Sequence, residues 1–367
     1  MSVNLPFGLL SRLDRPSDLF RHLGPNWYAA VMGTGIVANA AASLPFPWLR
    51  APGTVVWLLA SVLLVALTAA WIVHWVRYPA AARAHADHPV MAHFWGAPAM
   101  ALMTIGLGAL TFGKDLVGLN AALWIDWPLW TAGTLLGLVT AVWIPYKAIT
   151  SHAVDEDAVF GGWLMPVVPP MVSAATGAVL VQHLPAGQAR ATMLAACMAM
   201  FGVSLFATLA ILPQLWRRLM HSGTGPALMT PTLWIMLGPL GQSITAAGNL
   251  SDQVPGSTPI ALLYGLPTWG FALMWLALCV TLTMRAVRRG MPFGLTWWAF
   301  IFPVGTVVTA TSSLHAHTGM VALGWIATVL YAFLVVMWVK VAARTLRLSL
   351  RGDLFLPAPR AADLTIA

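Results

Sequence analysis

The chain has very few charged residues and almost no cysteine. Of its 367 residues 8% are charged, only 11 are acidic and two are cysteines. So little charge is untypical of a water-soluble surface, and two cysteines allow no disulfide framework. The 19 basic residues are spread over short segments between apolar runs. This distribution argues against nucleic acid as a partner and favours contact with an anionic lipid surface.

Apolar residues make up 59% of the chain and form repeated long runs. A run of roughly 20 residues crosses a hydrocarbon core of about 30 Å. Each run must be helical, because lipid offers no hydrogen-bond partner to free backbone groups. The sequence therefore predicts an all-α polytopic membrane protein with ten spans, over residues 27–44, 55–76, 94–112, 128–146, 161–181, 191–212, 227–250, 260–284, 295–314 and 321–339.

Lysine and arginine divide unequally between the two sides that ten spans define. The two terminal segments and the even-numbered connections hold 16 of the 19, and the other connections hold only Arg50, Lys114 and Arg190. Basic loops stay in the cytoplasm, so we expect both termini there and the protein in the cell membrane. The expected organisation is a cytoplasmic arm over 1–22, a transmembrane domain over 23–340 and a cytoplasmic tail over 341–367.

The odd-numbered spans differ in composition from the even-numbered ones. They hold 19 glycines and prolines, against 9 in the even spans. Such residues leave backbone groups in need of local partners, which is tolerated where a helix is buried in protein or lines a wet cavity. We interpret the odd spans as the inner helices of five helical hairpins in a quasi-fivefold arrangement around a central pore. Close packing through small residues is the alternative interpretation of the glycines.

Small and polar residues recur at helical spacing within the odd spans and predict the pore lining. Phe302, Thr306 and Thr309, for example, share one helical face. The predicted lining residues are Thr34, Gly35, Thr104, Gly108, Ser173, Thr176, Gly241, Gln242, Thr245, Thr306 and Thr309.

Charged residues are missing from the middle of every odd span, and Asp126 falls at a predicted span end. Cation pathways normally place carboxylates at membrane depth, so we expect a weakly held anion as the cargo. Phe302 precedes Pro303 on the lining face, and its ring is the expected hydrophobic gate. An isolated phenylalanine would otherwise be read as a core or lipid-facing residue. No cofactor, bound metal or enzymatic activity is expected.

Five segments carry a family resemblance. They are PNWYAAVMGTGI from Pro25, HPVMAHFWGAPAM from His88, LMPVVPPMVSAATG from Leu164, PTLWIMLGPLGQS from Pro231 and WWAFIFPVG from Trp297. In their order and spacing the chain resembles the tellurite-resistance/dicarboxylate transporter family, which includes the yeast malate permease, fungal sulfite efflux pumps and plant slow anion channels. The resemblance implies five hairpins around a pore, usually in a homotrimer. It also implies an occluding phenylalanine at Phe302, with Phe300 as the fallback. The substrates that it implies range from C4-dicarboxylates such as malate to sulfite and small inorganic anions.

Two alternatives stay open at this point. A proton-coupled C4-dicarboxylate carrier with alternating access could use His93, near the start of the third span, as a proton relay. A metal or haem enzyme would need imidazoles that face each other at one depth. The candidate histidines instead fall in connections and at span ends. They are the cluster of His85, His88 and His93 and the pair of His315 and His317.

Overall fold

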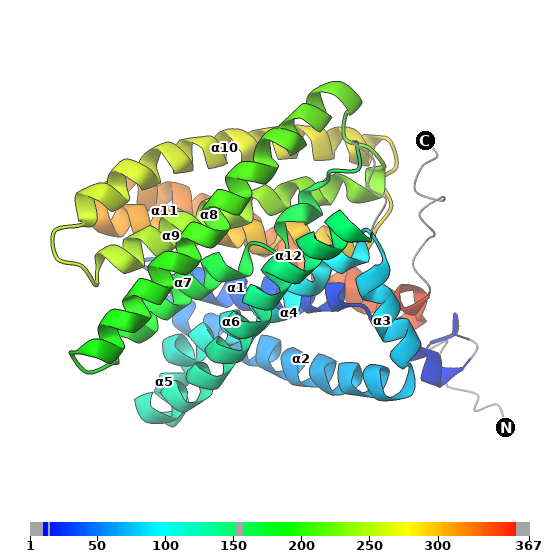
Figure 1. Cartoon of the computed structure of the whole chain (residues 1–367), viewed down its shortest axis with the longest axis horizontal. Coiled ribbons are helices and arrows are strands. Elements are labelled where there is room, and N and C mark those ends of the chain that lie inside the picture. The colour runs from blue at the N-terminus through cyan, green and yellow to red at the C-terminus, as the bar shows by residue number, and fades with distance from the viewer. Residues whose placement is uncertain (1–9, 14, 152–156, 357–367) are drawn as a thin grey trace.

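Helices of two lengths alternate along the chain (Figure 1). The computed structural model describes residues 10–13, 15–151 and 157–356, and over these it is helical, without strands. Five helices of 28 to 35 residues are α2 (Arg50–Arg77), α6 (Leu119–Thr150), α8 (Gln188–Ser222), α10 (Thr258–Arg288) and α12 (Val321–Arg351). The shorter helix that precedes each of them is α1 (Tyr28–Ala42), α4 (Gly96–Gly108), α7 (Pro169–Val181), α9 (Leu237–Ser251) or α11 (Phe302–Thr318).

Each short helix begins after a segment of 3-10 helix. These segments are Pro25–Trp27, Met91–Trp95, Gly161–Leu164, Ala227–Met236 and Leu295–Phe300. Proline helps to set the change of geometry, because it lacks an N–H and disfavours the α conformation in the residue before it. At its other end α4 passes through a π-helical turn, Ala109–Gly113, into α5 (Lys114–Val117). Smaller connecting elements are Pro16–Phe20, Pro47–Leu49, α3 (Pro79–Asp87) and Asp353–Phe355.

Seven helical stretches of the described chain are long and apolar enough to cross a membrane. They include all five long helices, together with Met91–Val117 and Leu295–Thr318. The protein is therefore helical and has the character of a polytopic membrane protein, as the sequence predicts. Helices α1, α7 and α9 have only 13 to 15 residues, fewer than a complete span needs. The count of ten spans stays a prediction.

The long helices extend beyond the predicted spans. Helix α6 begins at Leu119 instead of 128, so Asp126 lies inside a helix and not at its end. Its carboxylate is fully buried against Gly106 of α4. Helix α12 continues without a break to Arg351, so the predicted boundary between domain and tail falls within a helix. Residues 1–9 of the predicted arm and 357–367 of the predicted tail lie outside the described residues.

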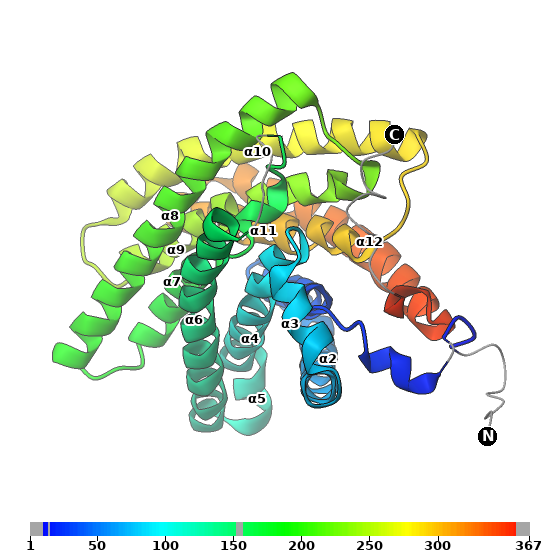
Figure 2. The ribbon, with the colours of Figure 1, turned by 45° about the vertical axis from the view of Figure 1, so that its right-hand side comes forward.

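The five short helices contact one another in a closed ring. Helix α1 contacts α4, α4 contacts α7, α7 contacts α9, α9 contacts α11, and α11 returns to α1. Each long helix packs outside this ring, across its own short helix and the next one. Figures 1 and 2 show α2, α6, α8 and α10 at the periphery of the bundle. In the most apolar part of the α4 stretch 83% of residues are buried, against 22% in that of α2. The long helices therefore present an apolar outer face suited to lipid.

Tryptophans of the long helices form hydrogen bonds with the short helices of the ring and the 3-10 segments before them. Trp57 of α2 donates its indole N–H to the carbonyl of Ile105 at 3.1 Å, and Trp130 of α6 donates to the carbonyl of Ser173 at 3.1 Å. Trp275 of α10 donates to the carbonyl of Leu233, in the 3-10 segment before α9, and Trp338 of α12 donates to the hydroxyl of Thr34 in α1. These bonds satisfy indole groups that lipid could not satisfy.

The two ends of the bundle differ in charge. The 3-10 segments before the short helices contact each other at one end, where the long helices also terminate with most of the arginines and lysines. We call this the basic end. The described termini meet there too, since Leu10 donates its backbone N–H to the carbonyl of Leu350 at 2.7 Å. Arg50, Lys114 and Arg190 lie at the opposite end.

Candidate transport pathway

Two cavities lie inside the ring of short helices. The smaller one, at the basic end, has a volume of about 20 Å³ and is lined almost entirely by apolar side chains, including Met32, Met100 and Phe302. The larger one has a volume of about 350 Å³ and reaches the opposite end, where Asp252 and His317 border it. Unlike the smaller cavity, this second cavity is lined by many hydroxyl and carboxamide side chains.

The same helix faces line both cavities. On four short helices the residue that borders the small cavity is followed one turn later by one that borders the large cavity: Met32 and Ile36, Met100 and Thr104, Val168 and Val172, Gly238 and Gln242. Residues four apart lie on one side of a helix. The two cavities are therefore stacked along the axis of the ring.

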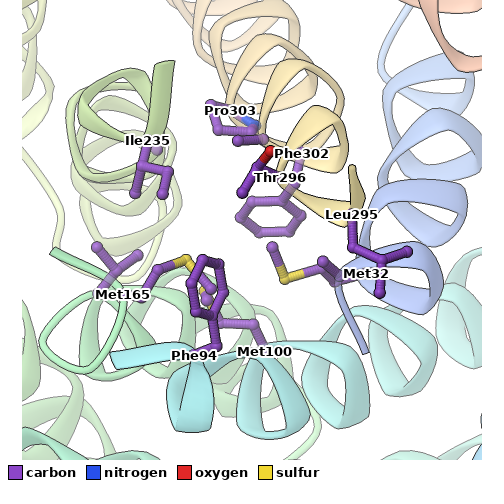
Figure 3. A pocket seen from close by; sticks show the side chains of 13 residues that line it. Met32, Phe94, Met100, Met165, Ile235, Leu295, Thr296, Phe302 and Pro303 are labelled. Atoms are coloured by element: carbon purple, nitrogen blue, oxygen red, sulfur yellow. The ribbon is translucent and has the colours of Figure 1, made fainter. Parts of the chain in front are cut away.

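Phe302 lies where the two cavities approach each other. It is only 2% exposed, and its ring points into the space between Met32, Phe94 and Met100 (Figure 3). A cavity of 20 Å³ has room for about one water molecule, and an apolar lining gives that water no partners. Almost no open space therefore remains beside this ring.

Phe300, the fallback for this position, borders neither cavity. Its ring packs edge-on against Trp234 and Trp297, with centroids 5.0 and 5.6 Å away. The two phenylalanines differ because α11 begins at Phe302, with Pro303 as its second residue. That change from 3-10 to α geometry turns Phe302 toward the axis while Phe300 stays in the core.

Five of the predicted lining residues border the large cavity. They come from four helices and are Thr104, Thr176, Gln242, Thr245 and Thr309. The lining also includes Asn39, Ser43, Asp252 and His317, which the prediction did not contain. For Asn39 a signal was present, since it is the one carboxamide in the first apolar run.

The predicted glycines line no part of the cavities and instead allow close helix contacts. A Cβ at Gly35 would lie 2.7 Å from Thr104 of α4. Gly108 faces the indole ring of Trp57, and Gly241 faces the backbone of Thr306. This corrects the prediction for all three glycines and favours the packing alternative at these positions.

Three predicted hydroxyl residues also face neighbouring helices instead of the axis. Thr34 accepts a hydrogen bond from Trp338 at 3.1 Å, and Ser173 accepts one from Thr134 of α6 at 3.0 Å. Thr306 donates to the carbonyls of Leu237, at 3.0 Å, and of Pro303. The prediction is corrected here as well, because each hydroxyl is used in a helix contact.

One known protein family matches most of the chain. The family model described as voltage-dependent anion channel (SLAC1) matches residues 22–346. The chain belongs to this family. The match covers the whole ring of short helices and the long helices outside it up to residue 346 of α12, and it confirms the resemblance found in the sequence.

Relatives in this anion-channel family cover nearly the full chain. An uncharacterized transporter of Methanocaldococcus jannaschii is 28% identical over 336 residues, which is 90% of this chain and 96% of that protein. A sulfite efflux pump of Arthroderma otae is 26% identical over 90% of this chain and 92% of its own length. A malic acid transport protein of Schizosaccharomyces pombe is 21% identical over 93% and 82%. The relatives named here are transporters, which agrees with the expectation of a non-enzyme.

His317 forms two hydrogen bonds where the large cavity opens, at the end opposite the basic end. Its Nδ1 lies 2.7 Å from the carbonyl of Ser313, and its Nε2 lies 3.0 Å from a carboxylate oxygen of Asp252. His317 thus joins the end of α11 to the Asp252 carboxylate at this mouth, and no arginine or lysine of the described chain borders the cavity.

The other histidines singled out in the sequence lie away from the axis. The ring of His85 stacks on that of His74 with centroids 5.3 Å apart. His93 lies between the rings of Phe160 and Trp163 and borders neither cavity. Over the described residues no group of three histidine, cysteine or carboxylate side chains is arranged to hold a metal ion.

Proposed function

We propose that this protein conducts small anions across the cell membrane along the axis of the short-helix ring. The closed ring of contacts and the five long helices outside it support ten spans in a quasi-fivefold arrangement of hairpins. In this proposal the 3-10 segments add the length that α1, α7 and α9 lack. The basic end, where the described termini meet, is the cytoplasmic end by the distribution of arginine and lysine.

The nature of the lining supports an anion as the cargo. Between the two mouths, no carboxylate among the described residues borders either cavity, and Asp252 at the outer mouth is paired with His317. A cation pathway would normally place carboxylates along this route. Arginine and lysine at the basic end raise the local concentration of anions before they enter.

Sulfite, a small inorganic anion or a C4-dicarboxylate such as malate is the proposed cargo. The printed names of two relatives point to sulfite and malate. No arginine or lysine of the described chain borders the 350 Å³ cavity, and tight capture of a dianion would need such partners. Weak binding and fast passage of a small anion suit this lining better. The homotrimer implied by the family resemblance stays a prediction.

The observation that carries the proposal is the pair of coaxial cavities closed by Phe302. Removing this ring joins the two cavities, so we expect Phe302→Ala to raise anion flux in proteoliposomes. A barrier lowered by about 1.4 kcal/mol gives a tenfold increase, and we expect at least that. The panel of anions is chloride, nitrate, sulfite, malate and succinate.

Phe300→Leu is the matched control. It removes part of a buried ring two residues before Phe302 in the chain, without opening the axis. We expect its flux to stay near that of the wild type. Equal flux in Phe302→Ala and the wild type would contradict the gate. Loss of transport without any conductance would instead favour the proton-coupled carrier.

A further inference from the structure

The threonine hydroxyl groups that border the large cavity have already used their protons. All five threonines that border it donate to backbone carbonyls: Thr104 to Met100 at 2.7 Å, Thr111 to Leu107 and Thr176 to Val172 at 2.8 Å, Thr245 to Gly241 at 3.2 Å and Thr309 to Thr306 at 3.0 Å. A hydroxyl has one proton to donate. Toward the cavity these threonines therefore present oxygen lone pairs, which attract no anion.

The two asparagines in the lining are also engaged. Asn39 donates a side-chain N–H to the carbonyl of Thr104 at 3.0 Å, and Asn249 donates one to the carbonyl of Ala175 at 2.9 Å. Each bond joins two helices of the ring, α1 to α4 and α9 to α7. Their carboxamides are thus held in place as part of the helix packing.

Gln242 is different from these residues. It lies one helical turn beyond Gly238, at the level where the large cavity begins behind Phe302. Its side chain makes no hydrogen bond within the described part of the chain, although it is only 6% exposed. The residues at the same level on three other helices are Ile36, Thr104 and Val172, and none of them offers a free N–H or O–H.

We propose that Gln242 is the side chain that binds the passing anion next to Phe302 and sets the selectivity between anions. Its Nε2 group offers two N–H donors, which replace part of the water that an anion loses on entering the narrow axis. The ligand class is a small anion with an exposed acceptor atom, an oxyanion oxygen or a halide. The proposal rests on the proposed function. It assigns the lining threonines no part in anion binding.

The test compares two substitutions that each remove a polar group at nearly constant size. Gln242→Met removes the two N–H donors of the side chain. Thr176→Val removes a hydroxyl that donates its proton to the backbone carbonyl of Val172. Both are placed in the Phe302→Ala background, and the flux ratio of chloride to nitrate is measured in proteoliposomes. We expect Gln242→Met to lower chloride flux about tenfold more than nitrate flux, because chloride loses the more strongly held hydration shell. Thr176→Val should leave the ratio unchanged.

The flux ratio protects the test against misfolding, because a misfolded protein would lose the flux of both anions alike. A second variant tests the effect of charge at the same position. Gln242→Glu keeps the shape of the side chain but replaces the donors by a negative charge, and we expect it to abolish flux of both anions. An unchanged chloride-to-nitrate ratio in Gln242→Met would overturn the assignment, as would an equal shift in Thr176→Val. Failure of the proposed function looks different, since then neither the wild type nor Phe302→Ala conducts any anion of the panel.

Discussion

The contact between α9 and α11 depends on the absence of a side chain at Gly241. A Cβ built at this position would lie 2.5 Å from the backbone carbonyl carbon of Thr306 and 2.6 Å from its oxygen. Backbone atoms cannot move aside as a flexible side chain can. Gly241→Ala must therefore push the two helices apart, and it strains the hydrogen bond from Thr306 to Leu237 across the same contact.

The size of the effect follows from two opposing contributions. Overpacking of a well-packed contact costs about 1–3 kcal/mol, and replacing glycine by alanine in a helix gains about 1 kcal/mol. Gly270→Ala in α10 isolates the second contribution, because no atom lies within 4 Å of its added Cβ. We expect Gly270→Ala to be neutral or slightly stabilising, and Gly241→Ala to be less stable than it by about 1–3 kcal/mol.

Thermal unfolding of the two variants and the wild type in one detergent measures this difference. Because helix propensity acts on both alanines, the gap between the variants reports the α9–α11 contact. Equal melting temperatures for Gly241→Ala and Gly270→Ala would refute the reasoning. Gly241 would then have free space beside it, as the sequence-based assignment to the pore lining requires.

Two further predictions concern histidines. Burial, followed by the charges of three neighbouring histidines, lowers the pKa of His85 to about 4. As pH falls, His85 is therefore protonated in the unfolded chain before it is protonated in the folded protein, so the free energy of unfolding should decrease as pH drops from about 6.5 toward 4. Thermal unfolding at pH 7 and pH 5 measures this loss of stability, and His85→Gln should make it smaller. At the mouth opposite the basic end, His317→Ala removes the hydrogen-bond partner of the Asp252 carboxylate and leaves its negative charge uncompensated. Nitrate flux in proteoliposomes should therefore fall, and unaltered flux in this variant would contradict the reasoning.

The polar residues of the odd spans show what helical spacing in the sequence can and cannot predict. Phe302, Thr306 and Thr309 share a helical face by spacing, which predicts that all three meet the axis. In the structure Phe302 and Thr309 border cavities, whereas Thr306 bonds to α9. A helical face about 100° wide can border a cavity and a neighbouring helix at once, and spacing alone does not divide it.

The sequence was enough to determine a helical membrane protein with alternating inner and outer helices. The evidence lay in its hydropathy, in the placement of arginine and lysine, and in the uneven distribution of glycine and proline. The choice of Phe302 as the occluding residue followed from the family resemblance and its neighbour Pro303. Only the tertiary structure decided which hydroxyls and glycines face the axis. Gly35, Gly108 and Gly241 serve helix contacts, and Gln242 keeps its donors free. The physical reason is that each of these roles depends on the atoms of a second helix that lies far away in the sequence. A local sequence pattern does not show where two such helices cross.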